Sequence, residues 1–204
     1  MTRTPKRRPG TILFALGALM LLAALLLVLY NLWDDWRAGR ETAALLTQIE
    51  VETPAASVTE QQIPDYVLDP TRDMPTVELD GEEYIGTLEI PALGLSLPVM
   101  SEWSYPRLKI APCRYVGTAY QPGFVIAAHN YTSHFGRLKE LTEGDSVTFT
   151  DADGNVFTYR VAAVEVLAHT AVEDMVSDEW DLSLFTCTIG GQTRLTVRCE
   201  VVSP

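Results

Sequence analysis

The chain is poor in the residues from which metal sites are commonly built. Its 204 residues include only three histidines and three cysteines, with no C-x-x-C and no H-x-x-x-H spacing. Because zinc sites are commonly built on such spacings, the sequence gives no support for a structural zinc site. We therefore expect no cofactor and no metal. The remaining alternative is a calcium site among the acidic side chains Glu140, Glu143, Asp145, Glu173 and Asp174.

Positive charge is scarce beyond the first ten residues. Arg3, Lys6, Arg7 and Arg8 contribute +4 there, and because the whole chain carries −12, residues 11–204 sum to −16. Phosphate backbones repel so acidic a domain, which excludes nucleic acid as a partner. The sequence also lacks internal repeats and low-complexity tracts, and its length suits one compact domain with appendages.

One long apolar run stands near the N-terminus. Residues 11–33 are 23 residues without a charge, and a helix of that length crosses a hydrocarbon core of roughly 30 Å. A cleaved signal peptide would have a shorter apolar region and a small-x-small site, so we predict a retained, single-pass membrane anchor. Because basic residues are concentrated before the run, we expect a cytoplasmic N-terminus and an extracellular domain.

The rest of the chain divides by composition. Residues 34–51 have a helical pattern, and the prolines and polar residues up to 82 predict a linker. Short β-branched and aromatic runs then predict a small closed, mostly antiparallel β-barrel with a few short helices. The expected organisation is a cytoplasmic basic tail (1–10), a transmembrane anchor (11–33), an extracytoplasmic helical stalk and linker (34–82) and a barrel domain (83–204).

Turn residues separate nine expected strands and two short helices. The helices are expected at Trp103–Ile110 and Phe135–Leu141. The expected strands are Tyr84–Ile90, Leu95–Met100, Arg114–Gly117, Phe124–Ala128, Ser146–Thr150, Val156–Ala162, Ala163–Leu167, Leu182–Cys187 and Arg194–Val202.

Three side chains in this pattern suit acyl transfer. The strand LSLFTC ends at Cys187, and the short loop TIGGQT leads to Arg194 at the start of the next strand. Antiparallel neighbours would bring the thiol close to the guanidinium, which favours the thiolate. The apolar run FVIAA stops at His129, and cysteine catalysis needs an imidazole to protonate the departing amine. Spacing alone does not show that the three side chains meet.

Four blocks of the sequence resemble the sortase family. LSLFTC followed by RLTV is similar to the family's T-[LIV]-x-T-C signature with its downstream arginine, and FVIAAHN to its strand ending in Gly-His or Ala-His. HFGRLKELTEGDSV resembles a Phe-x-x-Leu-x-x-Leu-x-x-Gly-Asp stretch, and IGTLEIPALGLSLPV resembles the opening Ile-Pro hairpin. The blocks occur in family order over about residues 83–202.

This resemblance implies a membrane-anchored cysteine transpeptidase of a Gram-positive-type cell surface. Cys187 would attack a C-terminal sorting motif of a secreted protein and form a thioacyl intermediate, which an amine of peptidoglycan or of a pilin resolves. His129 would carry the proton, Arg194 would contact the substrate backbone and the oxyanion, and Thr186 would help line the motif-binding groove. The implied partners are therefore secreted proteins, an amine acceptor and membrane lipid.

Several points stay open or depart from the family pattern. Ser183 stands where threonine is usual, and the subclass is open between class B, which the helix after the anchor resembles, and class A or D, which the short 167–182 stretch resembles. We expect His134 to be an exposed loop residue, Arg198 to be a surface or groove-wall charge, and Cys113 and Cys199 to be reduced packing thiols. The alternatives are a catalytically inactive barrel that binds surface proteins, or another cell-wall cysteine transpeptidase.

Overall fold

The computed structural model of the protein describes residues 9–52 and 63–202. The chain divides into two compact units, with the boundary between Arg37 and Ala38. Most of the expected basic tail and part of the expected linker, residues 53–62, lie outside the described residues.

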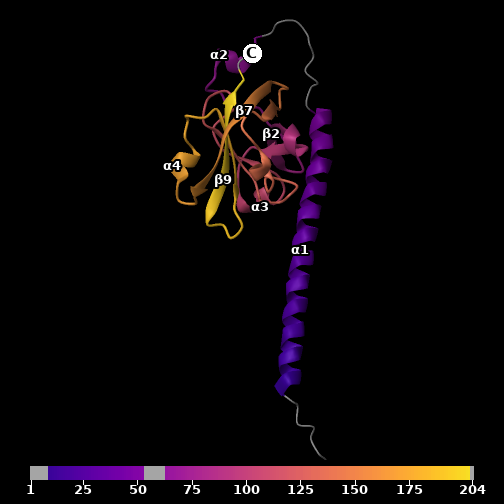
Figure 1. Cartoon of the computed structure of the whole chain (residues 1–204). Helices are drawn as coiled ribbons and strands as arrows, with labels where there is room; N and C mark the ends of the chain where they lie inside the picture. Colours follow the sequence, from indigo (N-terminus) through magenta and orange to yellow (C-terminus); the bar gives the residue numbers. More distant parts are fainter. Residues whose placement is uncertain (1–8, 53–62, 203–204) are drawn as a thin grey trace, which may run out of the picture. The chain divides into compact units, whose positions relative to one another are not determined.

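The first helix, α1 (Pro9–Glu52), is continuous over 44 residues, so the expected anchor and stalk form a single helix (Figure 1). Among the described residues it is the one helix that is long and apolar enough to cross a membrane, with a mean hydropathy of 3.0 over its most apolar window. Side chains from 10 to 33 are exposed. An exposed apolar surface of this length suits a lipid environment.

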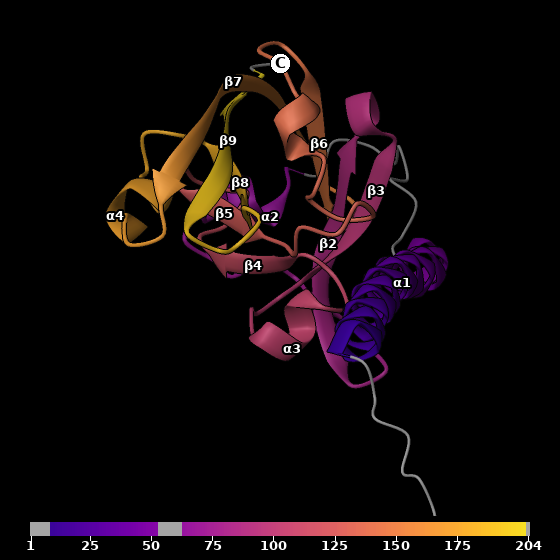
Figure 2. The ribbon, with the colours of Figure 1, turned by 60° about the horizontal axis from the view of Figure 1, so that its bottom comes forward.

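The second unit is a closed β-barrel. Eight strands form it in the order β2-β3-β4-β5-β8-β9-β7-β6, and β6 pairs with β2 to close the ring, while β1 extends the sheet beside β2. Figure 2 shows the strands arranged around the barrel axis. The described strands are β1 (Val77–Leu79), β2 (Glu82–Ile90), β3 (Leu95–Met100), β4 (Cys113–Val116), β5 (Phe124–Ala127), β6 (Ser146–Asp151), β7 (Val156–Ala168), β8 (Leu182–Cys187) and β9 (Thr193–Val201).

Two of the strand pairs are parallel, and one of them matters for the site. β5 runs parallel to β8, with Ala127 opposite Phe185, whereas β8 and β9 form an antiparallel hairpin. The C-terminal end of β5, the C-terminal end of β8 and the N-terminal end of β9 therefore lie together at one edge of the barrel.

The barrel interior is filled by large apolar side chains. Leu88, Phe124, Phe149 and Val197 are completely buried, and the two phenylalanine rings meet edge to face at 5.2 Å. Burying each such side chain contributes about 1.5–3 kcal/mol. At the closing seam β2 contains Gly86 with φ of +146°, where an added Cβ would lie 2.0 Å from the Thr150 carbonyl oxygen, so only glycine allows the two strands to pair here.

The second part of α1, residues 38–52, belongs to the barrel unit. Ala38, Thr42, Leu45 and Ile49 recur at helical spacing and are buried. Leu45 and Ile49 pack into a cluster outside the barrel, together with Leu79, Tyr84, Met100, Ala111 and Cys113. The expected stalk is therefore docked along the side of the barrel from Ala38 to Ile49.

The expected short elements differ from the observed ones. The two expected helices are shorter in the structure. The first is α3 (Tyr105–Leu108), and the second is a 3-10 turn, η2 (Leu138–Glu140). Residues 156–168 form one strand where two were expected, because a bulge near Val161 lets pairing with β9 continue. The remaining helical elements, which the sequence pattern did not predict, are α2 (Asp65–Leu68), η1 (Pro91–Leu93) and α4 (Val172–Met175).

Candidate active site

Cys187 is the last residue of β8 and is half-buried. Its register partner on β9 is Arg194, also half-buried. Directly paired residues project from the same face of a sheet, with Cβ atoms about 4.5–5.5 Å apart. The short connection expected from the sequence therefore places Cys187 and Arg194 directly opposite each other on one face of the hairpin.

The loop between these two residues is closed by its own hydrogen bonds. The Thr188 amide donates to the Thr193 carbonyl at 3.1 Å, and the hydroxyls of the same two residues lie 2.7 Å apart. Nη1 of Arg194 donates to the carbonyls of Gly191 and Thr193, at 3.0 and 3.1 Å. These contacts hold the Arg194 guanidinium against the loop, at the edge of the barrel where Cys187 ends its strand.

His129 reaches the same edge from β5. The amide of Ala128 donates to the Phe185 carbonyl at 3.2 Å, and the Ala128 carbonyl accepts a hydrogen bond from the Thr186 hydroxyl at 2.9 Å. The residue before His129 is thus fixed to the residue before Cys187. All three side chains predicted from the sequence come from neighbouring strand ends at one edge.

Thr186 is 3 % exposed. Its hydroxyl bonds the Ala128 carbonyl, and this contact explains why a threonine suits the position before Cys187: the hydroxyl fastens β8 to the end of β5. A part in lining the motif-binding groove stays a prediction.

An apolar surface lies on the outer side of the strands that lead to the site. Val125, Ala127, Phe185 and Met175 of α4 form one buried cluster. Tyr115 lies against the Phe185 ring, edge to face at 5.3 Å. The alternation of β8 puts Phe185 on the same face as Cys187, so this cluster forms the floor next to the thiol.

The prediction for Arg198 was wrong. Its side chain is 2 % exposed, with Nε donating to Glu165 Oε1 at 2.7 Å and Nη1 to Ser183 Oγ at 2.8 Å. Its guanidinium also donates to the carbonyls of Asp174 and Met175 in α4. Alternation correctly placed Arg198 outside the barrel lumen, but α4, which has no clear sequence signal, covers that face.

The prediction for His134 was also wrong. Its side chain is completely buried, and Nε2 lies 3.1 Å from the Thr42 hydroxyl of α1. A single histidine in a polar loop is usually exposed. This one is buried because the docked part of α1 covers it, and that helix is distant in the sequence.

Cys113 and Cys199 are free thiols, as predicted, and both are completely buried. Cys199 belongs to the barrel interior and Cys113 to the cluster beneath α1. Burial raises the pKa of each thiol to about 12. Both therefore stay protonated at neutral pH and are poor nucleophiles.

Two of the five acidic residues considered for calcium are engaged in local contacts. Glu140 pairs with Arg137 at 2.9 Å, and Asp145 accepts hydrogen bonds from the amide and hydroxyl of Thr142. Within residues 9–52 and 63–202 no group of three His, Cys, Asp or Glu side chains is arranged to hold a metal ion. Independence from metals and cofactors stays a prediction.

Comparison with known proteins identifies the family. The sortase domain model matches residues 88–202. Sortase C1 from Streptococcus suis is 26% identical, with 59% of this chain and 74% of that chain covered and a TM-score of 0.53. Sortase E from Streptomyces avermitilis is 25% identical, with 59% of this chain and 88% of that chain covered and a TM-score of 0.51.

A third solved structure shares the fold over most of the chain. Sortase A from Corynebacterium diphtheriae is 19% identical, with 85% of this chain and 93% of that chain covered and a TM-score of 0.54. A search of curated protein sequences gave no match. The family model covers more than half of the chain, and the barrel matches solved sortases, so the protein belongs to the sortase family.

Proposed function

We propose that the chain is a membrane-anchored sortase in which Cys187, His129 and Arg194 carry out transpeptidation. The substrate is a sorting motif in a secreted protein, and the acceptor is an amine of the cell wall or of a pilin. The observation that carries the proposal is the register pairing of Cys187 with Arg194 beside the strand end that leads to His129.

The first half of the reaction cleaves the motif. The Cys187 thiolate attacks a backbone carbonyl carbon, and the resulting oxyanion accepts hydrogen bonds from the Arg194 guanidinium, a permanently charged planar donor. The C–N bond then breaks, and His129 delivers a proton to the leaving amine. The products are a thioester on Cys187 and the released C-terminal fragment.

The second half transfers the acyl group. An incoming amine attacks the thioester carbonyl, His129 takes its proton, and the thiolate leaves. A new amide bond replaces the thioester, and the enzyme returns to its starting state. Water in place of the amine would give hydrolysis only.

The apolar floor formed by Val125, Ala127, Phe185 and Met175 is buried, and the half-buried Tyr115 and Leu167 pack against it. It lies along β8 toward Cys187, so a peptide bound along the strand would present a backbone carbonyl to the thiol. We assign apolar side chains of the sorting motif to Tyr115 and Leu167 on this floor. We also propose that Thr186 helps to line the groove that binds the sorting motif.

The membrane part of the proposal rests on α1. Basic residues precede its apolar portion, so we assign the N-terminus to the cytoplasm and the barrel to the outer surface. Protease added to intact protoplasts should remove the barrel. Protection of the barrel, or its release into the medium with a processed N-terminus, would contradict this topology.

The activity itself is tested with a peptide library and a small amine. The detergent-solubilised full chain should cleave a subset of peptides and join their N-terminal fragments to the amine through a new amide bond. The Cys187→Ala variant should do neither. A wild-type protein that binds peptides without cleaving them would instead be the inactive binding barrel.

A further inference from the structure

The loop that begins at His129 is packed against α1. We propose that the docked part of α1, residues 38–49, holds this loop in its active arrangement, with Thr42, His134 and Tyr131 as positioning residues for the His129 imidazole. The inference deepens the proposed function and rests on it. Under this proposal, the helix that continues the membrane anchor helps to position a catalytic side chain.

The contact begins at Thr42, which is 3 % exposed. Its hydroxyl donates to the Ile110 carbonyl at 3.2 Å and lies 3.1 Å from His134 Nε2. A hydroxyl has one proton, so the bond to Ile110 leaves only its lone pairs for the imidazole. With the hydroxyl proton on the Ile110 carbonyl, Nε2 of His134 is the donor in that contact.

From His134 the contact continues to His129 through one ring. Tyr131 packs edge to face on His134, with ring centroids 5.4 Å apart, and on the other side its centroid lies 4.9 Å from that of His129. The three rings form a continuous series from the buried threonine of α1 to the half-buried imidazole at the candidate site. Because packed rings resist displacement, the position of His134 constrains that of His129.

The backbone of the loop is equally constrained. The Phe135 amide donates to the His129 carbonyl at 3.1 Å, and the amides of His134 and Gly136 donate to the Tyr131 carbonyl at 3.0 and 2.8 Å. An added Cβ on Gly136 would lie 2.5 Å from the Asn130 carbonyl oxygen, so glycine permits this tight closure. The loop therefore moves as a unit with His134.

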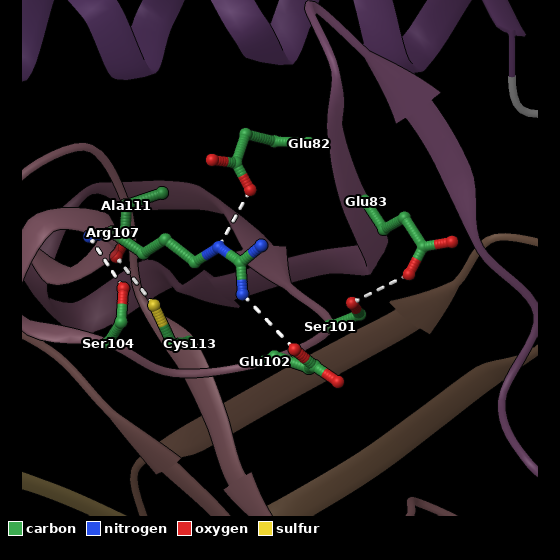
Figure 3. A network of polar contacts seen from close by, with 8 residues as sticks. All are labelled: Glu82, Glu83, Ser101, Glu102, Ser104, Arg107, Ala111 and Cys113. Carbon is green, nitrogen blue, oxygen red and sulfur yellow. Dashed lines mark hydrogen bonds and ion pairs between the residues drawn. The ribbon is translucent and has the colours of Figure 1, made fainter.

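Two further sets of contacts fix α1 against the loop and its neighbours. Gly39 approaches so closely that an added Cβ would lie 3.0 Å from Ser133 Cβ. Leu45 and Ile49 fasten the next turns to the barrel. The segment that supplies the Ile110 carbonyl is itself anchored by an ion pair from Arg107 to Glu82 of β2, at 2.7 Å (Figure 3).

Two more contacts of Arg107 stabilise the segment that contains Ile110. Arg107 also pairs with Glu102 at 3.2 Å, and its amide is capped by the Ser104 hydroxyl at 3.3 Å. Figure 3 shows Arg107 reaching between the two carboxylates from the α3 turn. The acceptor for Thr42 is therefore part of a fixed segment rather than a loose loop.

Placement of the imidazole matters because proton delivery depends on it. A general acid must be within hydrogen-bond reach of the leaving nitrogen, about 2.6–3.2 Å. A misplacement of about 1 Å can cost about 100-fold in rate. Losing the Thr42 contact should therefore reduce turnover while leaving the apolar peptide-binding floor intact.

The test compares two threonines of the same helix in the detergent-solubilised full chain. Thr42→Val removes the buried hydroxyl and keeps the shape, whereas Thr47→Val removes an exposed hydroxyl that bonds within the helix, to the Ala43 carbonyl. With the library peptide that acylates Cys187 fastest, Thr42→Val should lower kcat about 10- to 100-fold and change KM less than about threefold. Thr47→Val should match the wild type, and Thr42→Ser should restore most of the loss.

A second measurement does not depend on activity. Amide hydrogen exchange in residues 129–136 should be at least about tenfold faster in Thr42→Val than in Thr47→Val, because local opening raises exchange. If Thr42→Val fails to fold, Tyr131→Leu serves in its place, since Tyr131 is half-exposed and its backbone bonds are kept. The expected changes are the same.

The outcomes separate the two proposals. In one outcome Cys187 is acylated, and the Thr42→Val and Thr47→Val variants have the same kcat and the same amide exchange. This result would overturn the positioning role and leave the proposed function standing. If no peptide acylates wild-type Cys187, the proposed function fails. Exchange alone then decides the coupling: faster exchange in residues 129–136 supports it, and unchanged exchange contradicts it.

Discussion

Cys187 and Arg194 are register partners on β8 and β9, at the edge of the barrel where both strands border the 188–193 loop. The next arginine on β9, Arg198, is opposite Ser183 instead. Four residues along a strand span roughly 13 Å, so one reacting carbonyl cannot contact both guanidinium groups. The proposed mechanism therefore assigns the oxyanion to Arg194, and the buried contacts of Arg198 give that residue a structural part.

Replacing Arg194 should reduce turnover without unfolding the barrel. Loss of one oxyanion donor typically costs about 10²–10³ in kcat, so we expect a fall of at least that size for Arg194→Ala. Arg194→Lys should also be impaired, because an ammonium lacks the planar fork. Peptide-cleavage rates, with circular dichroism as the folding control, measure the effect; an active Arg194→Ala enzyme would refute the assignment.

Replacing Arg198 should instead reduce stability. Arg198 is buried and bonded to Glu165, Ser183 and two carbonyls of α4, and removal of one member of such a buried network costs about 3–5 kcal/mol. The free energy of unfolding of Arg198→Ala in urea should fall by about that amount. Arg160→Ala, on an exposed position of β7, is the matched control and should stay within about 0.5 kcal/mol of the wild type.

The three cysteines should differ sharply in reactivity. Cys187 is half-buried, whereas burial raises the pKa of Cys113 and Cys199 to about 12. At pH 8 a small alkylating reagent should modify one thiol in the folded protein, and none in Cys187→Ala. After denaturation all three should react, and recovery of a linked Cys113–Cys199 peptide without reduction would contradict this prediction.

The same buried thiols predict a loss of stability in alkali. Their pKa is higher in the folded protein, so folding favours the protonated form; this contribution is complete below about pH 9, the usual thiol value, and declines as the pH rises toward about 12. Burial also raises the pKa of Tyr84 to about 12. Urea midpoints measured from pH 8 to pH 11 should fall most steeply above pH 9, and a flat profile would exclude this linkage.

The barrel could be predicted from local patterns because its signals are local. β3 and β8 have the predicted bounds, since alternating apolar residues are delimited by Gly94 and the Asp181 turn on one side and by the following loops on the other. The edge where Cys187 and Arg194 meet followed from a short connection between two strands. Such features depend on residues close together in the chain.

The wrong predictions, for His134 and Arg198, concern contacts between segments that are distant in the sequence. His134 is buried by Thr42, 92 positions earlier, and Arg198 is covered by carbonyls 23 and 24 positions before it. No periodicity of the loop or of β9 encodes those neighbours. The fold of the barrel was therefore accessible from sequence, whereas the environment of side chains outside its lumen was not.

The most direct test of the proposed mechanism is the mass of the intermediate. Wild-type protein mixed with a cleaved library peptide and quenched rapidly should gain the mass of the N-terminal peptide fragment, located on Cys187 by peptide mapping. The adduct should disappear faster when an amine is added, with formation of the corresponding amide. Peptide cleavage that proceeds without an adduct on Cys187, or that persists in Cys187→Ala, would contradict the mechanism.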